Sequence, residues 1–287
     1  TRNFDLGLQG AGKDITFPIQ VDLLTALADE GNAAAMGKLG KVYRMQGKIK
    51  ESLVWFEKAA KKKNIEACVV LARILLTGNG GRIEPDKPGG IKWLKAAAEL
   101  GDVGSMNGLG ERILNRDVKG AQFDEGVKWI TKAAKNGLAS AQTNLGRMYI
   151  NGDVKGIKQD FPKAKEWLLK AARQNFPPAQ FSLGQFYMQG REQGKPNHQE
   201  AIKWYRLAAR QGHARAQFAV GMMHIDGTGV EKSFKEGYKW LFIAQQYGMK
   251  GIDNRLRECA KELTPSDIRR AVVEAKQFRA KNYYHPI

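Results

Sequence analysis

The sequence predicts an all-α fold, a right-handed α/α superhelical solenoid of about six helix-pair repeats with N- and C-terminal capping helices. Three observations predict it. All six tryptophans of the 287-residue chain lie in one recurring phrase, at spacings of 36 to 38 residues. A second recurring phrase begins twelve residues after each tryptophan. Both phrases place their apolar residues at helical spacing, and a period of this length is typical of stacked helix pairs.

The first phrase predicts an amphipathic helix, which we call helix B. Its tryptophans are Trp55, Trp93, Trp129, Trp167, Trp204 and Trp240. A small residue lies three positions before each tryptophan and an alanine four positions after it, so these positions share one helix face. We therefore expect the six tryptophans to form the structural core of the repeats. Glycine, or Asn175 in one repeat, stands eight residues after the tryptophan and predicts the helix end, whereas Lys63 breaks this pattern in the first repeat.

The second phrase reads Ala-x-x-x-Leu-Gly, as at Ala35, Leu39 and Gly40, and predicts a second helix, helix A. Its glycine leaves room for a neighbouring helix to approach closely. The turn from helix B to the next helix A keeps one length, whereas the path from helix A to its own helix B takes 20 to 26 residues, counted from alanine to tryptophan. The insertions are therefore expected to project from one edge of the stack.

This pattern divides the chain into three predicted segments. Residues 1–16 are predicted to be a flexible leader, residues 17–262 the solenoid, and residues 263–287 a C-terminal capping helix and tail. VDLLTALADEG, residues 21–31, looks like an additional helix B with Leu23 in the tryptophan position. Thr264, Pro265 and Asp267 are typical of a helix start and predict the cap at the other end.

The two phrases together resemble the Sel-one-like repeat, a relative of the tetratricopeptide repeat, over roughly residues 21–260. The resemblance rests on Ala-x-x-x-Leu-Gly-x-x-Tyr, a Gly-containing loop, and then Trp-x-x-Lys-Ala-Ala and Gly. It implies a non-enzymatic, protein-binding α-solenoid, often bacterial. Some bacterial members are periplasmic immunity proteins that neutralise secreted toxic effectors, including phospholipases. This implies a periplasmic location, with the cytoplasm as the alternative. An adaptor for envelope assembly or signalling is another alternative.

By analogy with tetratricopeptide-like arrays, helix A is expected to line a concave protein-binding groove. Positions two and six after its alanine then point away from the core. The candidate binding residues at these positions are Lys41, Arg73, Arg147, Phe181, Gln185, Phe218 and Met222. Phe181, Phe218 and Met222 stand where a polar residue is expected. Packing between adjacent repeats explains them as well as a binding hot spot does.

The charge favours acidic partners without naming one. The chain has 47 Lys and Arg against 29 Asp and Glu, a net charge of +18. Solubility and support of helix ends explain much of this excess. The alternative is a basic adaptor that binds nucleic acid or an anionic membrane surface. Nucleic acid is the less favoured of these partners, because the tryptophans are predicted to pack inside rather than to stack on bases.

The sequence offers little for catalysis or for a cofactor. GLQGAGKD, residues 7–14, matches a phosphate-binding loop through Gly7, Gly12 and Lys13, but Asp14 replaces the required Ser or Thr. The four histidines and two cysteines do not show metal-ligand spacing. No run of about 18 apolar residues predicts a membrane span. We therefore expect no catalytic residue, cofactor or metal, and no enzyme activity.

Overall fold

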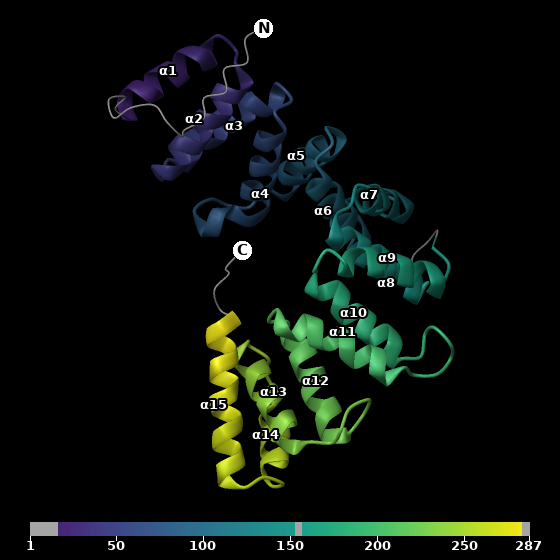
Figure 1. Cartoon of the computed structure of the whole chain (residues 1–287). Helices are drawn as coiled ribbons and strands as arrows, with labels where there is room; N and C mark the ends of the chain where they lie inside the picture. Colours follow the sequence, from purple (N-terminus) through teal and green to yellow (C-terminus); the bar gives the residue numbers. More distant parts are fainter. Residues whose placement is uncertain (1–16, 153–156, 283–287) are drawn as a thin grey trace. The chain divides into compact units, whose positions relative to one another are not determined.

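The computed structural model describes residues 17–152 and 157–282, and the GLQGAGKD segment lies outside them. Within these ranges every regular element is an α-helix (Figure 1). The helices are α1 (Phe17–Asp29), α2 (Ala33–Met45), α3 (Ile49–Lys61), α4 (Ile65–Gly81), α5 (Lys87–Glu99), α6 (Val103–Leu114), α7 (Phe123–Lys135), α8 (Ala139–Asn151), α9 (Phe161–Ala172), α10 (Pro177–Met188), α11 (His198–Arg210), α12 (Ala214–Asp226), α13 (Phe234–Gln246), α14 (Asp253–Ala260) and α15 (Pro265–Asn282).

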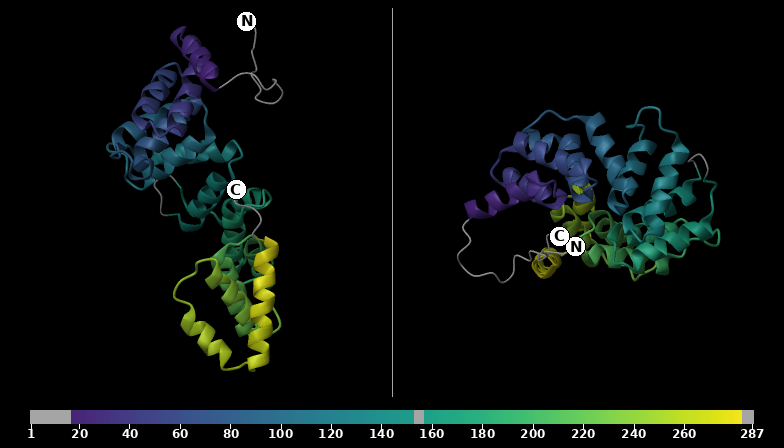
Figure 2. Two further views of the ribbon diagram at one scale, coloured as in Figure 1. Left: turned by 90° about the vertical axis from the view of Figure 1, so that its left-hand side faces the viewer. Right: turned by 90° about the horizontal axis from the view of Figure 1, so that it is seen from above.

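The helices alternate as the two phrases predict, which confirms an all-α solenoid of six helix pairs. The even-numbered helices from α2 to α12 are helix A, and the odd-numbered helices from α3 to α13 are helix B. The chain divides into two compact units, Thr1–Leu109 (unit 1) and Gly110–Ile287 (unit 2). Within each unit, consecutive helices pack side by side, as two further views show (Figure 2). In unit 2, α15 packs against α13.

The glycine of helix A determines how closely the two helices of a repeat approach. A Cβ atom added at Gly184 would lie 2.4 Å from the ring of Tyr205, and one at Gly40 would lie 2.8 Å from the ring of Phe56. Gly146 has the same relation to Leu168, at 2.8 Å. These distances are shorter than side chains tolerate, so only glycine fits these three positions without a shift. The second repeat has Ala72 there, and the residue after its tryptophan, Leu94, is only half-buried. The predicted role of the glycine is therefore confirmed.

The residue packed against this glycine is the one that follows the tryptophan. In five of the repeats it is buried, as Phe56, Ile130, Leu168, Tyr205 and Leu241. The prediction that all six tryptophans form the core is therefore wrong. Only Trp240 is buried, at 9% exposure, and the other five, Trp55, Trp93, Trp129, Trp167 and Trp204, are half-buried.

Helix geometry explains why the tryptophan lies at the edge of the core. It precedes the buried residue by one position, and successive helical residues point about 100° apart. The outward side of the ring meets a lysine in several repeats. Lys58 Nζ lies 4.1 Å from the ring centre of Trp55, and Lys170 Nζ lies 4.4 Å from that of Trp167. The aromatic and basic residues of this phrase thus contact each other at the surface.

The ends of helix B adopt the left-handed conformation that the glycines predict. Gly137 has φ 89° and Asn175 has φ 56°. Lys63, which interrupts the sequence pattern, has φ 61°. The first repeat therefore keeps the same helix stop, although a lysine is less suited than glycine to a positive φ.

Buried glutamines connect successive repeats of unit 2, and sequence analysis missed them. Gln142 and Gln180 follow the alanine of helix A by one position, and each donates a hydrogen bond to a carbonyl oxygen of the preceding helix B, at 3.1 and 3.4 Å. Each also accepts a hydrogen bond from a glutamine that follows helix B of its own repeat, Gln174 at 2.9 Å and Gln211 at 2.8 Å. This chain of hydrogen bonds fixes the spacing of the repeats.

The residue after the tryptophan should contribute more to the stability of a repeat than the tryptophan itself. We expect Leu168→Ala to lower the free energy of unfolding by about 2–5 kcal/mol, because it leaves a cavity in a closed core. Trp167→Ala should cost less, since water and the Lys170 side chain can fill a space at the surface. Urea unfolding of both variants measures the difference. A larger loss for Trp167→Ala would contradict this assignment of the core.

Candidate functional site

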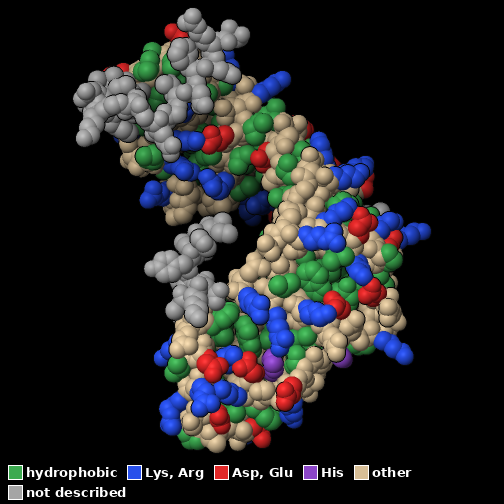
Figure 3. All heavy atoms as spheres, viewed as in Figure 1, with side chains coloured by type: hydrophobic (Ala, Val, Ile, Leu, Met, Phe, Trp, Pro, Cys, Tyr) green, Lys and Arg blue, Asp and Glu red, His purple; other side chains and the backbone are tan. Residues whose placement is uncertain are grey.

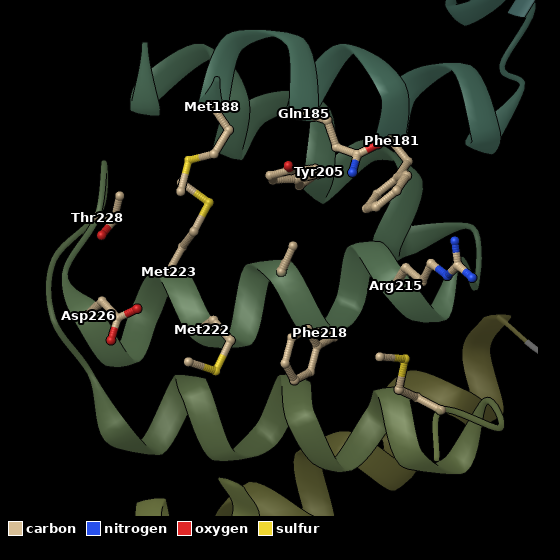
Figure 4. Close-up of a pocket in the computed structure, with 12 residues that line it drawn as sticks. Phe181, Gln185, Met188, Tyr205, Arg215, Phe218, Met222, Met223, Asp226 and Thr228 are labelled. Carbon is tan, nitrogen blue, oxygen red and sulfur yellow. The ribbon is translucent and has the colours of Figure 1, made fainter. Parts of the chain in front are cut away.

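A groove in unit 2 collects the apolar residues that helix A leaves outside the core (Figure 4). Its volume is about 350 Å³. Four of the seven predicted binding residues line it, namely Phe181 and Gln185 from α10 and Phe218 and Met222 from α12. The structure thus brings together residues of two successive repeats that stand at matching positions of the sequence pattern.

Helical spacing explains how each wall of the groove forms. Phe181, Gln185 and Met188 lie at i, i+4 and i+7 on α10, so they share one face. Leu183 and Phe186, on the other face of α10, are buried in the core. On α12, Phe218 and Met222 lie half-buried beside the groove while Val220 is buried. The pattern differs in α6 and α8, where Asn107 and Thr143, at the position of Phe218, are buried.

Methionines supply the part of the groove that sequence analysis missed. Met188 and Met223 lie toward one end (Figure 4), and Met249, which follows α13, also lines the groove. Met188 could have been found by extending the face of Phe181 by one more turn. Met249 could not, because it comes from the turn after a helix B. Methionine side chains are flexible and polarisable, which suits a surface that adapts to its partner.

Aromatic contacts hold Phe181 in place at the edge of the groove. Its ring stacks on the imidazole of His213, with ring centres 4.7 Å apart and planes at 28°. It also contacts the Tyr205 ring, with centres 5.5 Å apart. Burial raises the pKa of Tyr205 well above its usual value, so this phenol remains neutral. Phe181 is half-buried, and its free side faces the groove.

The three basic residues predicted for the groove do not line it. Lys41 and Arg73 belong to unit 1, where Lys41 pairs with Glu66 at 2.5 Å and Arg73 is exposed. Arg147 is exposed on α8 in unit 2. Hydrophobic side chains lie beside Lys and Arg over the unit 2 helices (Figure 3). The groove itself is mainly apolar. Met222 stands at the position that Arg73 and Arg147 occupy in their own repeats, and Phe181 and Phe218 stand four positions earlier in theirs.

The chemistry of the groove suits binding. Its lining holds one cation, Arg215, and one carboxylate, Asp226. Among the described residues, no three His, Cys, Asp or Glu residues gather where they could hold a metal ion. Both cysteines are buried, and burial raises the pKa of Cys259 to about 11, which disfavours a reactive thiolate. In the part of the chain that the structure describes, no helix is both long and apolar enough to cross a membrane.

Comparison with known proteins agrees with the repeat geometry. The model of the Sel1 repeat matches six times, over residues 33–64, 65–102, 104–138, 139–176, 177–213 and 214–244. The chain belongs to the Sel1 repeat family. Each match begins at the first residue of helix A, or one residue later in α6, so the Sel1 repeats of this chain coincide with its helix pairs.

Solved structures show the same fold. Protein c5321, a protective antigen of uropathogenic Escherichia coli, is 28% identical with a TM-score of 0.76. The match covers 91% of this chain and 56% of that protein, so the chain spans little more than half its length. A Sel1 repeat protein of Oxalobacter formigenes is 26% identical with a TM-score of 0.64, over 79% of this chain and 99% of that one.

Two further comparisons carry no argument about function. The immunity protein Pa5087 of Pseudomonas aeruginosa is 20% identical with a TM-score of 0.49, over 79% of this chain and 82% of that protein. This likeness is too distant to transfer a role to the Sel1 repeats of this chain. Among curated proteins, none matches the sequence.

His213 makes the stability of the groove depend on pH. It caps α12, and its Nδ1 accepts a hydrogen bond from the Ala216 N–H at 3.2 Å. Burial and then the Arg215 charge lower the pKa of His213 from its usual 6.5. The folded state therefore favours neutral histidine, so the stability is complete above pH 6.5 and is lost as the pH falls through the folded pKa.

We expect His213→Asn to remove this part of the pH dependence, because asparagine caps a helix without titrating. Asn32 and Asn64 occupy the same cap position in earlier repeats. Melting temperatures between pH 4.5 and 8 measure the effect, and both proteins keep His224. The wild type should lose more stability than the variant on acidification. Equal slopes for the two proteins would show that the His213 cap does not titrate in this range.

Proposed function

We propose that the protein binds a partner protein through the groove between α10 and α12. Sel1 repeats are scaffolds for protein–protein interaction, and a protein-binding role follows from membership of the family. The placement of binding in this groove rests on one observation: Phe181, Phe218 and Met222 line it together, as half-buried side chains at the edge of the core. Clustered large apolar side chains at a surface are typical of interaction sites.

The composition of the groove favours a protein partner over a small molecule. Its apolar residues come from α10, α12 and the turn after α13, and polar residues occur mainly at its ends. Aromatic and methionine side chains are enriched at the centres of protein interfaces. Phe181 is also held by two ring contacts, so binding would cost little additional ordering of that side chain.

A finer proposal concerns the identity of the partner. We infer a secreted toxic effector, such as a phospholipase, which the protein would bind and neutralise in the periplasm. This proposal is supported by the resemblance to a family that includes immunity proteins of that kind. The basic adaptor for nucleic acid or membranes remains a prediction. In unit 1, Lys41 pairs with Glu66 and Lys61 pairs with Glu57, and these pairs reduce the free positive charge there.

Removing the aromatic anchors tests the groove. We expect Phe181→Ala combined with Phe218→Ala to weaken partner binding about tenfold or more, because anchors of this kind contribute most of the energy of an interface. The matched control is Leu207→Ala with Val273→Ala, two residues of unit 2 that are 42% and 53% exposed and lie outside the groove.

The measurement is affinity capture from lysate, with mass spectrometry of the proteins retained. Proteins that the control retains and the groove variant loses are the expected partners. A toxin or lipase among them would support the finer proposal. Equal retention by the two variants, with unchanged melting temperatures, would rule out this groove as the binding site.

A further inference from the structure

Two opposite charges stand at the two ends of the groove. Arg215 lies in the first turn of α12, beside Phe181, whereas Asp226 is the last residue of α12, beside Thr228 (Figure 4). Both side chains are exposed, and neither has an ion-pair partner among the described residues. Eleven residues of helix separate them, which corresponds to about 16 Å or three turns.

These two charges lie at the ends of α12 where its dipole disfavours them. The N-terminal end of a helix carries partial positive charge and its C-terminal end partial negative charge, so Arg215 and Asp226 each lie at the unfavourable end. The arrangement differs between helices. In α7, Asp124 lies in the first turn and Lys135 in the last, which is favourable, whereas α5 begins with Lys87 and ends with Glu99. The charges of α12 therefore add to the helix dipole and make one end of the groove positive and the other negative.

We infer that the groove receives an amphipathic helix of a partner protein, with an acidic side chain at the Arg215 end and a basic side chain at the Asp226 end. This inference rests on the proposed function and adds the partner's conformation and polarity. Arg215 and Asp226 supply the charge complementarity, and Phe181, Phe218 and Met222 supply the apolar contact.

A partner segment in an extended conformation is disfavoured in this groove, because its backbone polar groups would lack hydrogen bonds. Such a segment would lay its N–H and C=O groups against Phe and Met side chains, and an unpaired polar group loses free energy when it leaves water. A helix bonds these groups internally. Three turns of helix also present three large apolar side chains at i, i+4 and i+7, which matches the length of the groove.

The direction of the bound helix follows from its own dipole. An acidic residue stabilises an N-terminal end and a basic residue a C-terminal end. A partner helix with both features places its N-terminal end at Arg215 and its C-terminal end at Asp226. It then runs in the same direction as α12.

Two synthetic peptides of one composition test this inference. Each has 18 residues with leucines at i, i+4 and i+7. The matched peptide carries glutamates in its first turn and lysines in its last, and the swapped peptide carries the reverse. Fluorescence anisotropy measures their binding to the full chain. We expect the matched peptide to bind about three- to tenfold more tightly at low salt, and the difference to narrow at high salt.

Charge variants of the protein distinguish a preference caused by Arg215 and Asp226 from one caused by the different helicities of the two free peptides. Arg215→Glu with Asp226→Lys should reverse the preference, and Arg215→Gln with Asp226→Asn should reduce it to the part that peptide helicity produces. Helicity of the free peptides cannot produce a reversal. The charge-reversed protein should melt no lower than the wild type, because its charges now suit the dipole of α12.

Each negative binding result would contradict a different part of the proposal. Equal binding of both peptides to all variants would overturn the charge assignment and leave the groove as a binding site. Tighter binding of a proline-containing, non-helical peptide with the same side chains, or no binding of either helical peptide, would overturn the helical partner. Binding that persists unchanged in the Phe181→Ala, Phe218→Ala variant would instead contradict the groove, and with it the proposed function.

Discussion

The close contact between a glycine of helix A and the bulky residue after the tryptophan of helix B is the constraint on which the other features depend. At Gly184 and Tyr205 an added Cβ would lie 2.4 Å from the ring, so the ring lies directly against the backbone of α10. This contact determines which face of each helix is buried. The tryptophan, one position earlier, then lies at the edge of the core, and so do Phe181, Phe218 and Met222 of helix A, which are half-buried.

The groove is a consequence of that division. Positions outside the core are free to vary, and in α10 and α12 they carry Phe181, Phe218 and Met222 instead of polar residues. A buried glutamine holds these two repeats together, since Gln217 of α12 donates to the Ala209 carbonyl oxygen of α11 at 3.0 Å. A rigid scaffold with adaptable methionines at its surface suits a protein that binds another protein.

Much of this could be predicted from the sequence, because helix pairs repeat with a clear period. The helix pattern, the role of the glycine and four groove residues follow from spacing alone. The burial of tryptophan was predicted wrongly, because Trp and the residue after it fit one apolar face equally well and only the position of the partner glycine separates them. Met249 and the glutamine hydrogen bonds depend on contacts between different repeats, which the spacing within one repeat does not reveal.

A double-mutant cycle of Gly184→Ala and Tyr205→Leu tests the central contact most directly. The sister repeats carry leucine at this position, as Leu168 and Leu241. Alone, Gly184→Ala should lower the free energy of unfolding by about 1–3 kcal/mol, because its methyl group overlaps the ring. In the Tyr205→Leu protein the same change should cost at least about 1 kcal/mol less. Additive effects of the two substitutions, or a Gly184→Ala variant as stable as the wild type, would contradict the account.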